Sequence, residues 1–342
     1  MAKRSFLDIS FLLFNIWCLI ILPIVGINYF APIKEYSILF IVNLLVPFFI
    51  VSFLLFFFYW LFRKRKYLVA INIMALVCWY FFLGPYFMIS SSPAKESNEG
   101  IKIFTFNAHS FRGKYWNQKD YFAAKFDEFI GNEDPDIICL QEFDRRSNIQ
   151  YIKDTYLYSY FYKGSAALNK VSLSVYSNYP IISSGSIDFP NTVNGAIFVD
   201  LKIDQDTLRI YNIHLQSLQV RPGSFKREAP TNLLSRLGGS FAKQLEQVKI
   251  LKEHHSKSPY KSIICGDFNT TQYSGAFRIA SKGMKDSFIE KGSGYGTTYN
   301  FKFLPFRIDF VLADKEIEIT DHKNYNIEVS DHYPVMATFN LN

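Results

Sequence analysis

Three long apolar runs in the first ninety residues constrain the fold of this chain more than any other feature. They cover roughly residues 9–30, 36–62 and 67–89, and the second contains the uncharged stretch Phe53–Trp60. A helix needs about 20 residues to cross the hydrocarbon core of a bilayer. Strands and core helices of soluble domains are rarely so long and so uniformly apolar. Residues 1–90 therefore predict a transmembrane region with three helices.

The charges around these runs predict an orientation. Lys3 and Arg4 precede the first run, and Arg63–Lys66 separates the second from the third, whereas residues 31–35 carry one charge of each sign. The positive-inside rule then places the N-terminus in the cytoplasm, and three spans place everything after residue 90 outside it. The first run also fits a signal peptide, but two further spanning runs follow directly, so we favour a retained helix.

The rest of the chain predicts a separate domain. Residues 91–100 are polar and predict a linker, and residues 101–342 alternate between strand-like and helix-like stretches. Helical spacing of apolar residues occurs at 121–130 and 241–254, and short strand-like runs occur at 171–176, 197–203, 306–312 and 335–339. This mixture predicts an α/β or α+β domain with a central sheet. The Pro- and Gly-containing stretch 217–240 predicts a long loop, either a lid or a solvated insertion.

Charge and cysteine content bear on the class of protein but exclude neither nucleic-acid binding nor a disulfide. The net charge is +7, but residues 101–342 carry only twenty-nine Lys and Arg against twenty-six Asp and Glu. A strongly basic face, the usual sign of nucleic-acid binding, is therefore not evident in this domain. Four cysteines do not form a disulfide framework, although Cys139 and Cys265 both lie near strand ends and could be neighbours. We expect them to be free and buried.

Five short polar clusters carry the chemistry. They are Thr105–Asn107, Leu140–Glu142, Asn212–Leu215, Gly266–Asn269 and Ser330–His332. Most of them end an apolar, strand-like run, so rigid backbone is expected to direct their side chains toward one shared rim. Carboxylate and amide oxygens together with imidazoles could hold a hard divalent cation and move protons around a phosphate.

Together with Arg307–Phe310 and Tyr176–Pro180, these ordered clusters resemble the endonuclease/exonuclease/phosphatase superfamily, which includes DNase I-like nucleases, inositol polyphosphate phosphatases and neutral sphingomyelinases. The resemblance covers residues 101–341, the whole predicted domain. It implies an α+β fold, the DNase I-like four-layer α/β/β/α sandwich, here preceded by three transmembrane helices.

The resemblance also implies a metal site. Glu142 would be the principal ligand, Asn107 would supply an amide oxygen beside it, and Asp331 would be an additional acidic group near the ion. Mg²⁺ is the expected ion because phosphoryl-transfer sites commonly bind it through one or two carboxylates and water. Mn²⁺ prefers similar ligands and is a plausible substitute.

The catalytic roles follow from the same resemblance. Asp267 would orient or deprotonate the attacking water, and Asn269, two residues later, would bind a phosphate oxygen. His332 would donate to the phosphoryl oxygens, Asp309 would fix its tautomer, and His214 would polarise the phosphate or assist the leaving oxygen. His109 could reach the same rim because it lies two residues after Asn107. No role is expected for the remaining histidines, His254, His255 and His322.

These features predict a membrane-tethered phosphoesterase that hydrolyses a phosphodiester or phosphomonoester by in-line attack of water. Three spans bring the site close to the bilayer, which favours a phospholipid or sphingolipid headgroup as substrate. An extracytoplasmic nuclease acting on DNA or RNA is an open alternative. A non-catalytic membrane protein that uses a nuclease-like fold for binding is disfavoured, because binding alone gives no chemical reason for the full set of polar side chains.

Overall fold

The computed structural model describes residues 6–89, 100–111, 118–162, 172–219, 228–301 and 304–341. The predicted linker, apart from Gly100, lies outside these residues. The chain divides into two compact units. The first comprises Met1–Tyr86, Gly223–Leu245 and Thr271–Arg278, and the second comprises Phe87–Pro222, Glu246–Thr270 and Ile279–Asn342. Each unit is described below by itself.

Helices formed by the apolar runs dominate the first unit. They are α1 (Phe6–Phe30), η1 (Lys34–Phe40), α2 (Ile41–Leu44), α3 (Val46–Phe62) and α4 (Lys66–Leu83). Within the described residues, α1 and α4 are each long and apolar enough to cross a membrane. The second run passes the same test only as a pair of helices bent by 49°. The break falls at Leu45, one residue before α3, which has a proline in its first turn. By length and composition, two of the described helices are suited to cross a membrane, or three if the bent pair is one span.

The third helix is shorter than the apolar run predicted. It ends at Leu83, and Gly84 and Pro85 follow. A proline disfavours helical backbone in the residue before it, so the helix stops ahead of this pair.

Buried polar side chains in this unit bind one another. The amides of Asn15 in α1 and Asn72 in α4 exchange two hydrogen bonds of 3.0 Å, and the indole of Trp60 donates to Asn15 at 3.3 Å. Arg63, from the predicted basic turn, pairs with Asp8. Between apolar helices such interhelical hydrogen bonds help to hold the bundle together.

Helix α8 (Pro230–Ser256) corrects the predicted loop at 217–240. Residues 220–227 of that loop lie outside the described residues, but the helix begins eleven residues before the predicted start at Phe241. Leu233, Leu237 and Phe241 lie four residues apart and are at most 3% exposed. Burial of this stripe outweighs the unfavourable helix propensity of Gly238 and Gly239, and proline is tolerated in the first turn of a helix.

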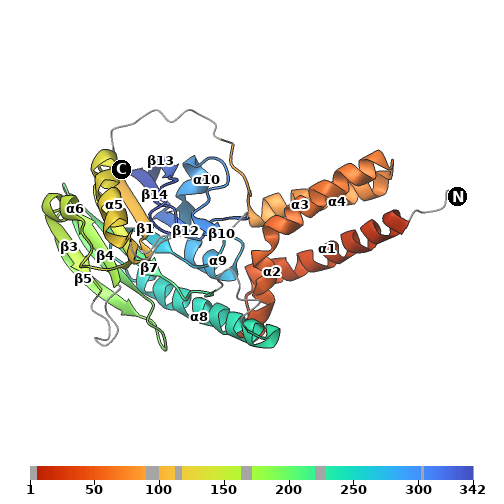
Figure 1. The fold of residues 1–342 in the computed structure, drawn as a ribbon, viewed down its shortest axis with the longest axis horizontal. Coiled ribbons are helices and arrows are strands. Elements are labelled where there is room, and N and C mark those ends of the chain that lie inside the picture. The colour runs from red at the N-terminus through yellow and green to blue at the C-terminus, as the bar shows by residue number, and fades with distance from the viewer. Residues whose placement is uncertain are drawn as a thin grey trace. The chain divides into compact units, whose positions relative to one another are not determined.

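Two six-stranded sheets form the second unit (Figure 1). The first has the order β13 (Glu318–Asn324), β14 (Val335–Asn340), β1 (Ile101–Asn107), β2 (Ile137–Phe143), β4 (Ser172–Ser177), β3 (Tyr158–Phe161). The second has the order β5 (Ile181–Asp188), β6 (Gly195–Ile203), β7 (Asp206–His214), β8 (Lys261–Asp267), β12 (Asp309–Asp314), β9 (Met284–Asp286). The pairs β1–β2 and β7–β8 are parallel, and the other named pairs are antiparallel.

Shorter elements complete this unit. They are η2 (His109–Phe111), α5 (Lys119–Glu133), α6 (Gln150–Thr155), α9 (Gly275–Ser281), which continues from the first unit, α10 (Ser287–Lys291), β10 (Tyr299–Phe301) and β11 (Leu304–Phe306). The predicted strand 306–312 is therefore interrupted: β11 ends at Phe306 and β12 begins at Asp309. Thr298 accounts for the break, because its Oγ1 accepts hydrogen bonds from the backbone N–H groups of Ile308 and Asp309.

Alternation along the strands builds the layers. Ile101 and Ile103 of β1 belong to the apolar core that both sheets share. Phe104 and Phe106 point the other way, into a second core with Phe126 and other residues of α5. On the outer side of the second sheet, Tyr211 contacts His254 of α8, with 3.0 Å between the hydroxyl and Nδ1. The expected α+β sandwich of two sheets with helices is confirmed. Cys139 and Cys265 lie in the shared core and are free.

His322 in β13 gives a prediction on stability. Its Nδ1 lies 2.8 Å from the hydroxyl of Ser287 and its Nε2 lies 3.1 Å from Oδ1 of Asn324. Burial and the charge of Arg307 lower its pKa to about 4, against the opposing effect of Asp286. As the pH falls, His322 is therefore protonated in the unfolded chain at a higher pH than in the folded protein. We expect stability contributed by neutral His322 to be present above pH 6.5 and lost toward pH 4, by roughly 1–3 kcal/mol.

The measurement is the urea midpoint of the full chain in detergent between pH 7 and pH 4. His322→Gln keeps a polar group but cannot titrate, so its midpoint should fall less steeply over this range. Equal pH slopes for the two proteins would contradict the assignment.

Candidate active site

The predicted polar clusters meet at one end of the sandwich. Asn107 ends β1, His214 ends β7 and Asp267 ends β8. Parallel neighbours end at the same edge of a sheet, which accounts for the proximity of His214 and Asp267, paired in register. Asp309 begins β12, which runs antiparallel to β8, and lies opposite Asp267. Strands from both sheets therefore supply one group of side chains.

A polar layer separates the apolar core from these side chains. The Nε2 amide of Gln141 donates to Thr105 Oγ1 at 3.0 Å and to Asn212 Oδ1 at 2.7 Å. Asn212 Nδ2 in turn donates to the carbonyls of Leu140 and Ser174, each at 2.9 Å. All three side chains are at most 1% exposed. Because the buried amides are hydrogen-bonded across the two sheets, the strand ends beyond them are held in register.

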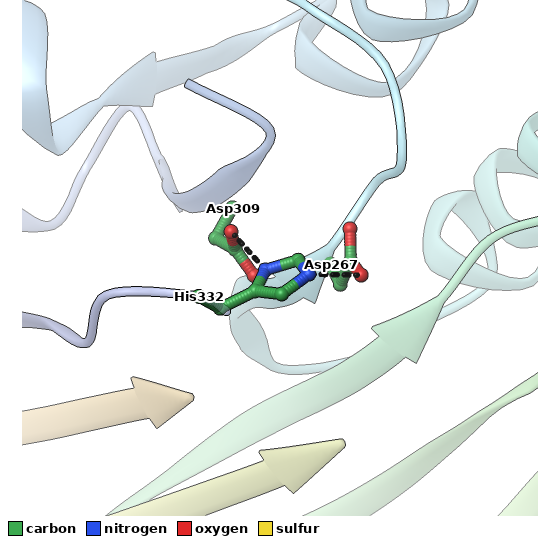
Figure 2. A group of neighbouring side chains, drawn as sticks. All are labelled: Asp267, Asp309 and His332. Carbon is green, nitrogen blue, oxygen red and sulfur yellow. Dashed lines mark hydrogen bonds and ion pairs between the residues drawn. The ribbon is translucent and has the colours of Figure 1, made fainter. Parts of the chain in front are cut away.

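His332 lies between two carboxylates (Figure 2). Its Nδ1 is 2.9 Å from Oδ2 of Asp309, and its Nε2 is 3.8 Å from Oδ2 of Asp267. Burial alone would lower the pKa of His332, but the charges of Asp309 and Asp267 raise it to about 10. Burial and the neighbouring charge of Asp309 raise the pKa of Asp267 to about 6, although His332 and His214 oppose this. The three residues thus form a buried group in which one imidazole lies between two carboxylates.

Asp267 is held by amide donors. It accepts hydrogen bonds from Asn107 Nδ2 at 2.8 Å, from Asn269 Nδ2 at 3.1 Å and from the backbone N–H of Asn269 at 2.7 Å. Gly266 permits this placement, because a Cβ there would lie 2.2 Å from the carbonyl oxygen of Ile213. Asn269 also donates to the carbonyl of Leu215 at 3.0 Å. Asn269 therefore supports Asp267 directly, a contact that the sequence analysis did not predict.

Glu142 reaches the group through an irregular strand. By alternation after the inward-facing Gln141, Glu142 would point toward α5. Its backbone instead has a left-handed φ of 45° at a register shift between β2 and β4. The carboxylate consequently lies 3.3 Å from Asn107 Nδ2 and 3.5 Å from His214 Nε2. Burial opposes its ionisation, but the charges of His214, His109 and His332 outweigh burial and lower the pKa of Glu142.

His214 faces two carboxylates with one ring nitrogen. Its Nε2 is 3.5 Å from Glu142 Oε1 and 3.7 Å from Asp267 Oδ2, and it is buried with no hydrogen-bond partner among the described residues. Its Nδ1 lies 3.3 Å from the amide nitrogen of Asn194. An amide donor at Nδ1 places the proton of a neutral ring on Nε2. Asn194 lies in the loop before β6, and no motif in the sequence around it predicts this contact.

Asp331 contacts a histidine. Its Oδ1 is 3.0 Å from Nδ1 of His109, and the two side chains are 41% and 36% exposed. Burial opposes ionisation of Asp331, but the hydrogen bond from His109 and the charge of His332 bring its pKa to about 2. His109 begins three successive residues with left-handed backbone, ending at Phe111, whose ring is fully buried. The proximity predicted for His109 is confirmed.

The donor set fits a hard divalent cation. Within the described residues, Asp267, Asp309 and His332 offer three ligand atoms within 4.8 Å of one another. Nδ1 of His332 already contacts Asp309 at 2.9 Å. Glu142 and the amide of Asn107 lie beside Asp267 and add oxygen ligands of the type that Mg²⁺ prefers. None of these donor residues is a cysteine. The group therefore does not suit a metal that prefers thiolate ligands.

Comparisons with known proteins identify the family of this chain. A model of the Endonuclease/Exonuclease/phosphatase family matches residues 104–332. A second model, described only as a domain of unknown function, matches residues 7–86. No curated protein matches the chain.

Solved structures share the fold. An endonuclease/exonuclease/phosphatase from Beutenbergia cavernae is 18% identical over 71% of this chain and 72% of its own, with a TM-score of 0.55. One from Bacteroides vulgatus is 15% identical over 72% of this chain and 100% of its own, with a TM-score of 0.55. D. rerio TDP2, complexed with a single-strand DNA product, is 16% identical over 71% of this chain and 100% of its own, with a TM-score of 0.52. At these identities the likeness extends to the fold alone.

Proposed function

The chain belongs to the endonuclease/exonuclease/phosphatase family, and from this premise we propose that it is a membrane-tethered, divalent-metal-dependent phosphoesterase. The observation that carries the proposal is the buried chain Asp309–His332–Asp267 beside Glu142 and Asn107. We infer that these side chains would supply a proton acceptor, a charged donor and oxygen ligands for a cation around one point.

Asp267 is proposed to hold the attacking water and accept its proton as the oxygen bonds to phosphorus. A carboxylate with a pKa raised toward neutrality is a better base than an ordinary aspartate. The phosphorus–oxygen bond to the leaving group then breaks, and that oxygen takes up a proton. His214 is suited to this second transfer, because Nε2 faces the site and Asn194 holds the ring.

His332 is proposed to donate to the phosphoryl oxygens as negative charge accumulates on them, and Asp309 keeps its ring in place. Asn269 is proposed to position Asp267 through its backbone N–H and its side-chain amide. To bind a phosphate oxygen as well, its amide would have to release the carbonyl of Leu215. Glu142 and Asn107 would hold the ion, with Asp331 as the additional acidic group. When bound, Mg²⁺ or Mn²⁺ supplies positive charge that offsets the charge of the phosphoryl oxygens.

The membrane setting is part of the proposal. The two to three apolar helices at residues 6–83 support a tether, and the basic residues at 63–66 support an N-terminus in the cytoplasm. The catalytic domain would then lie outside the cytoplasm. A reporter enzyme that works only outside the cytoplasm, fused after Asn342, should be active, and its inactivity would refute this orientation.

A substrate panel tests the proposed function. The full chain in detergent or in nanodiscs should release product with Mg²⁺ from at least one phosphoester, and excess chelator should abolish the release. The panel should contain glycerophospholipids, sphingomyelin, single- and double-stranded DNA, RNA and a chromogenic phosphodiester. Tethering and the nearly neutral catalytic domain favour a lipid headgroup. The fold shared with a DNA-bound protein favours a nuclease as the second candidate. No turnover of any member would contradict the proposal.

A further inference from the structure

One segment of the second unit contacts both members of the Asp309–His332 pair. It comprises residues 292–299, which connect α10 to the first residue of β10. The segment and its partners described below all belong to the second unit. Its last two residues, Thr298 and Tyr299, make the contacts with the pair.

Thr298 binds the backbone beside both catalytic side chains. It is fully buried, and its Oγ1 accepts hydrogen bonds from the backbone N–H groups of Ile308 at 2.9 Å and Asp309 at 3.0 Å. A hydroxyl oxygen has two lone pairs, so both acceptor positions are used. The carbonyl of Thr298 accepts a third bond, of 2.7 Å, from the N–H of Tyr333, the residue after His332. One residue therefore ties the start of β12 to the strand end that carries the imidazole.

Tyr299 packs against the imidazole itself. Tyr299 and His332 form an isolated antiparallel bridge, and the centroids of their rings lie 4.9 Å apart. This separation is within the range of favourable aromatic pairs. Because Nδ1 of His332 also contacts Asp309 at 2.9 Å, the ring is restrained by a polar contact and an aromatic contact together.

The rest of the segment is fixed by contacts of its own. The N–H of Gly292 donates to the carbonyl of Phe288 at 2.8 Å, and Gly294 exchanges two hydrogen bonds of 2.8 Å with the backbone of Met88. Gly296 has a left-handed φ of 62°, and a Cβ there would lie 2.5 Å from the buried ring of Phe288. Glycine adopts this conformation without a steric penalty. The segment therefore has a defined path up to Thr298.

We propose that Thr298 and Tyr299 are positioning residues, with Thr298 setting the place of Asp309 and Tyr299 setting the orientation of the His332 ring. This inference rests on the proposed function for its kinetic readout. Without the Thr298 hydroxyl, the N–H groups of Ile308 and Asp309 would lose their acceptor, and the backbone would have to move to satisfy them. A displacement of about 1 Å at a reacting group can cost about 100-fold in rate.

The first test compares variants of the full chain in nanodiscs on a water-soluble chromogenic phosphodiester with Mg²⁺. Thr298→Val removes the acceptor and should lower kcat by about 10- to 100-fold, with KM changed less than about threefold. Thr298→Ser restores the oxygen and should keep kcat within about threefold of the unaltered protein. Thr320→Val is the matched control, because Thr320 Oγ1 has no hydrogen-bond partner among the described residues. A loss in Thr298→Ser as large as that in Thr298→Val would contradict the role of the hydroxyl.

A double variant separates positioning from a general loss of structure. If Thr298 acts through Asp309, adding Thr298→Val to Asp309→Asn should lower kcat by less than about threefold further. Fully multiplicative losses would overturn this part of the inference. For the aromatic contact, Tyr299→Leu should lower kcat by about 10-fold or more, whereas Tyr299→Phe retains the ring and should lose much less. Equal losses in these two variants would refute a role for the ring.

Hydrogen exchange supplies a readout that does not depend on activity. The backbone amides of Ile308 and Asp309 should exchange at least about tenfold faster in Thr298→Val than in Thr298→Ser or Thr320→Val. Thr298→Ala provides a second variant without the hydroxyl if Thr298→Val does not fold. Unchanged exchange at these two amides would overturn the inference, whatever happens to kcat. Faster exchange in a protein that hydrolyses no phosphoester would support the ordering role of Thr298 and refute the proposed function alone.

Discussion

Replacing Glu142 by glutamine should reduce metal-dependent turnover by at least about 100- to 1,000-fold and weaken Mn²⁺ binding in parallel. The substitution keeps the shape of the side chain but removes the charge that a hard cation requires. A bound cation contributes several kcal/mol to transition-state charge stabilisation, and each 1.4 kcal/mol or so corresponds to tenfold in rate. The Glu142 side chain is 33% exposed, so the fold should tolerate the change.

Two measurements check this prediction. Titration calorimetry with Mn²⁺ gives the change in affinity, and initial rates at saturating Mg²⁺ give the change in kcat. Glu253→Gln is a suitable control, because Glu253 is a 69% exposed carboxylate of α8 paired only with Lys257 among its described ion pairs. Unchanged Mn²⁺ affinity in Glu142→Gln would rule out Glu142 as the principal ligand.

His332→Gln should lower kcat by about 100- to 10,000-fold, the range expected for a positioned proton donor or acceptor. Asp309→Asn should cause a loss of similar size, because an amide neither balances the imidazolium charge nor fixes the tautomer. Groups that act as one unit give non-additive losses. The double variant should therefore be close to the worse single variant.

A second histidine–aspartate pair offers the matched control. His255 Nε2 lies 3.0 Å from Asp314 Oδ1, with 14% and 18% of the side chains exposed, in a pair outside the candidate site. His255→Gln and Asp314→Asn should leave kcat within about twofold of the unaltered protein. Thermal unfolding of all four single variants separates lost chemistry from lost folding. Strictly multiplicative losses for His332 and Asp309 would mean that the two residues act independently.

The positions of polar side chains at the strand ends could be predicted, because side chains alternate between the two faces of a strand and this pattern is visible in the local sequence. The run from Ile101 to Asn107 places every second side chain on one face, so the position of Asn107 follows from its strand alone. Asp267 and His214 are predictable in the same manner. Asp309 was predicted through the family resemblance, and the strand assigned around it from periodicity alone was too long.

Features that depend on backbone irregularity or tertiary packing were not predictable. The left-handed residue Glu142 breaks the alternation of β2, and periodicity cannot anticipate a bulge of this kind. The start of α8 was missed because burial of Leu233 and Leu237 overrides the glycines nearby. The contact between Asp331 and His109 depends on three successive residues with left-handed backbone, His109–Phe111. The sequence of η2 does not predict this conformation.

The composition of the first unit bears on how such a chain could have arisen. Separate family models match residues 7–86 and 104–332, as if an anchor had been joined to an independent enzyme. Yet Phe241, from the second range, packs against Phe40 at 6.0 Å between ring centroids, and Tyr273 joins the apolar cluster of the helices. A gene fusion alone does not create such surfaces. A chimaera that carries a foreign N-terminal segment would leave these rings without their partners, so exchanging residues 7–86 should destabilise the packing around Phe241 and Tyr273.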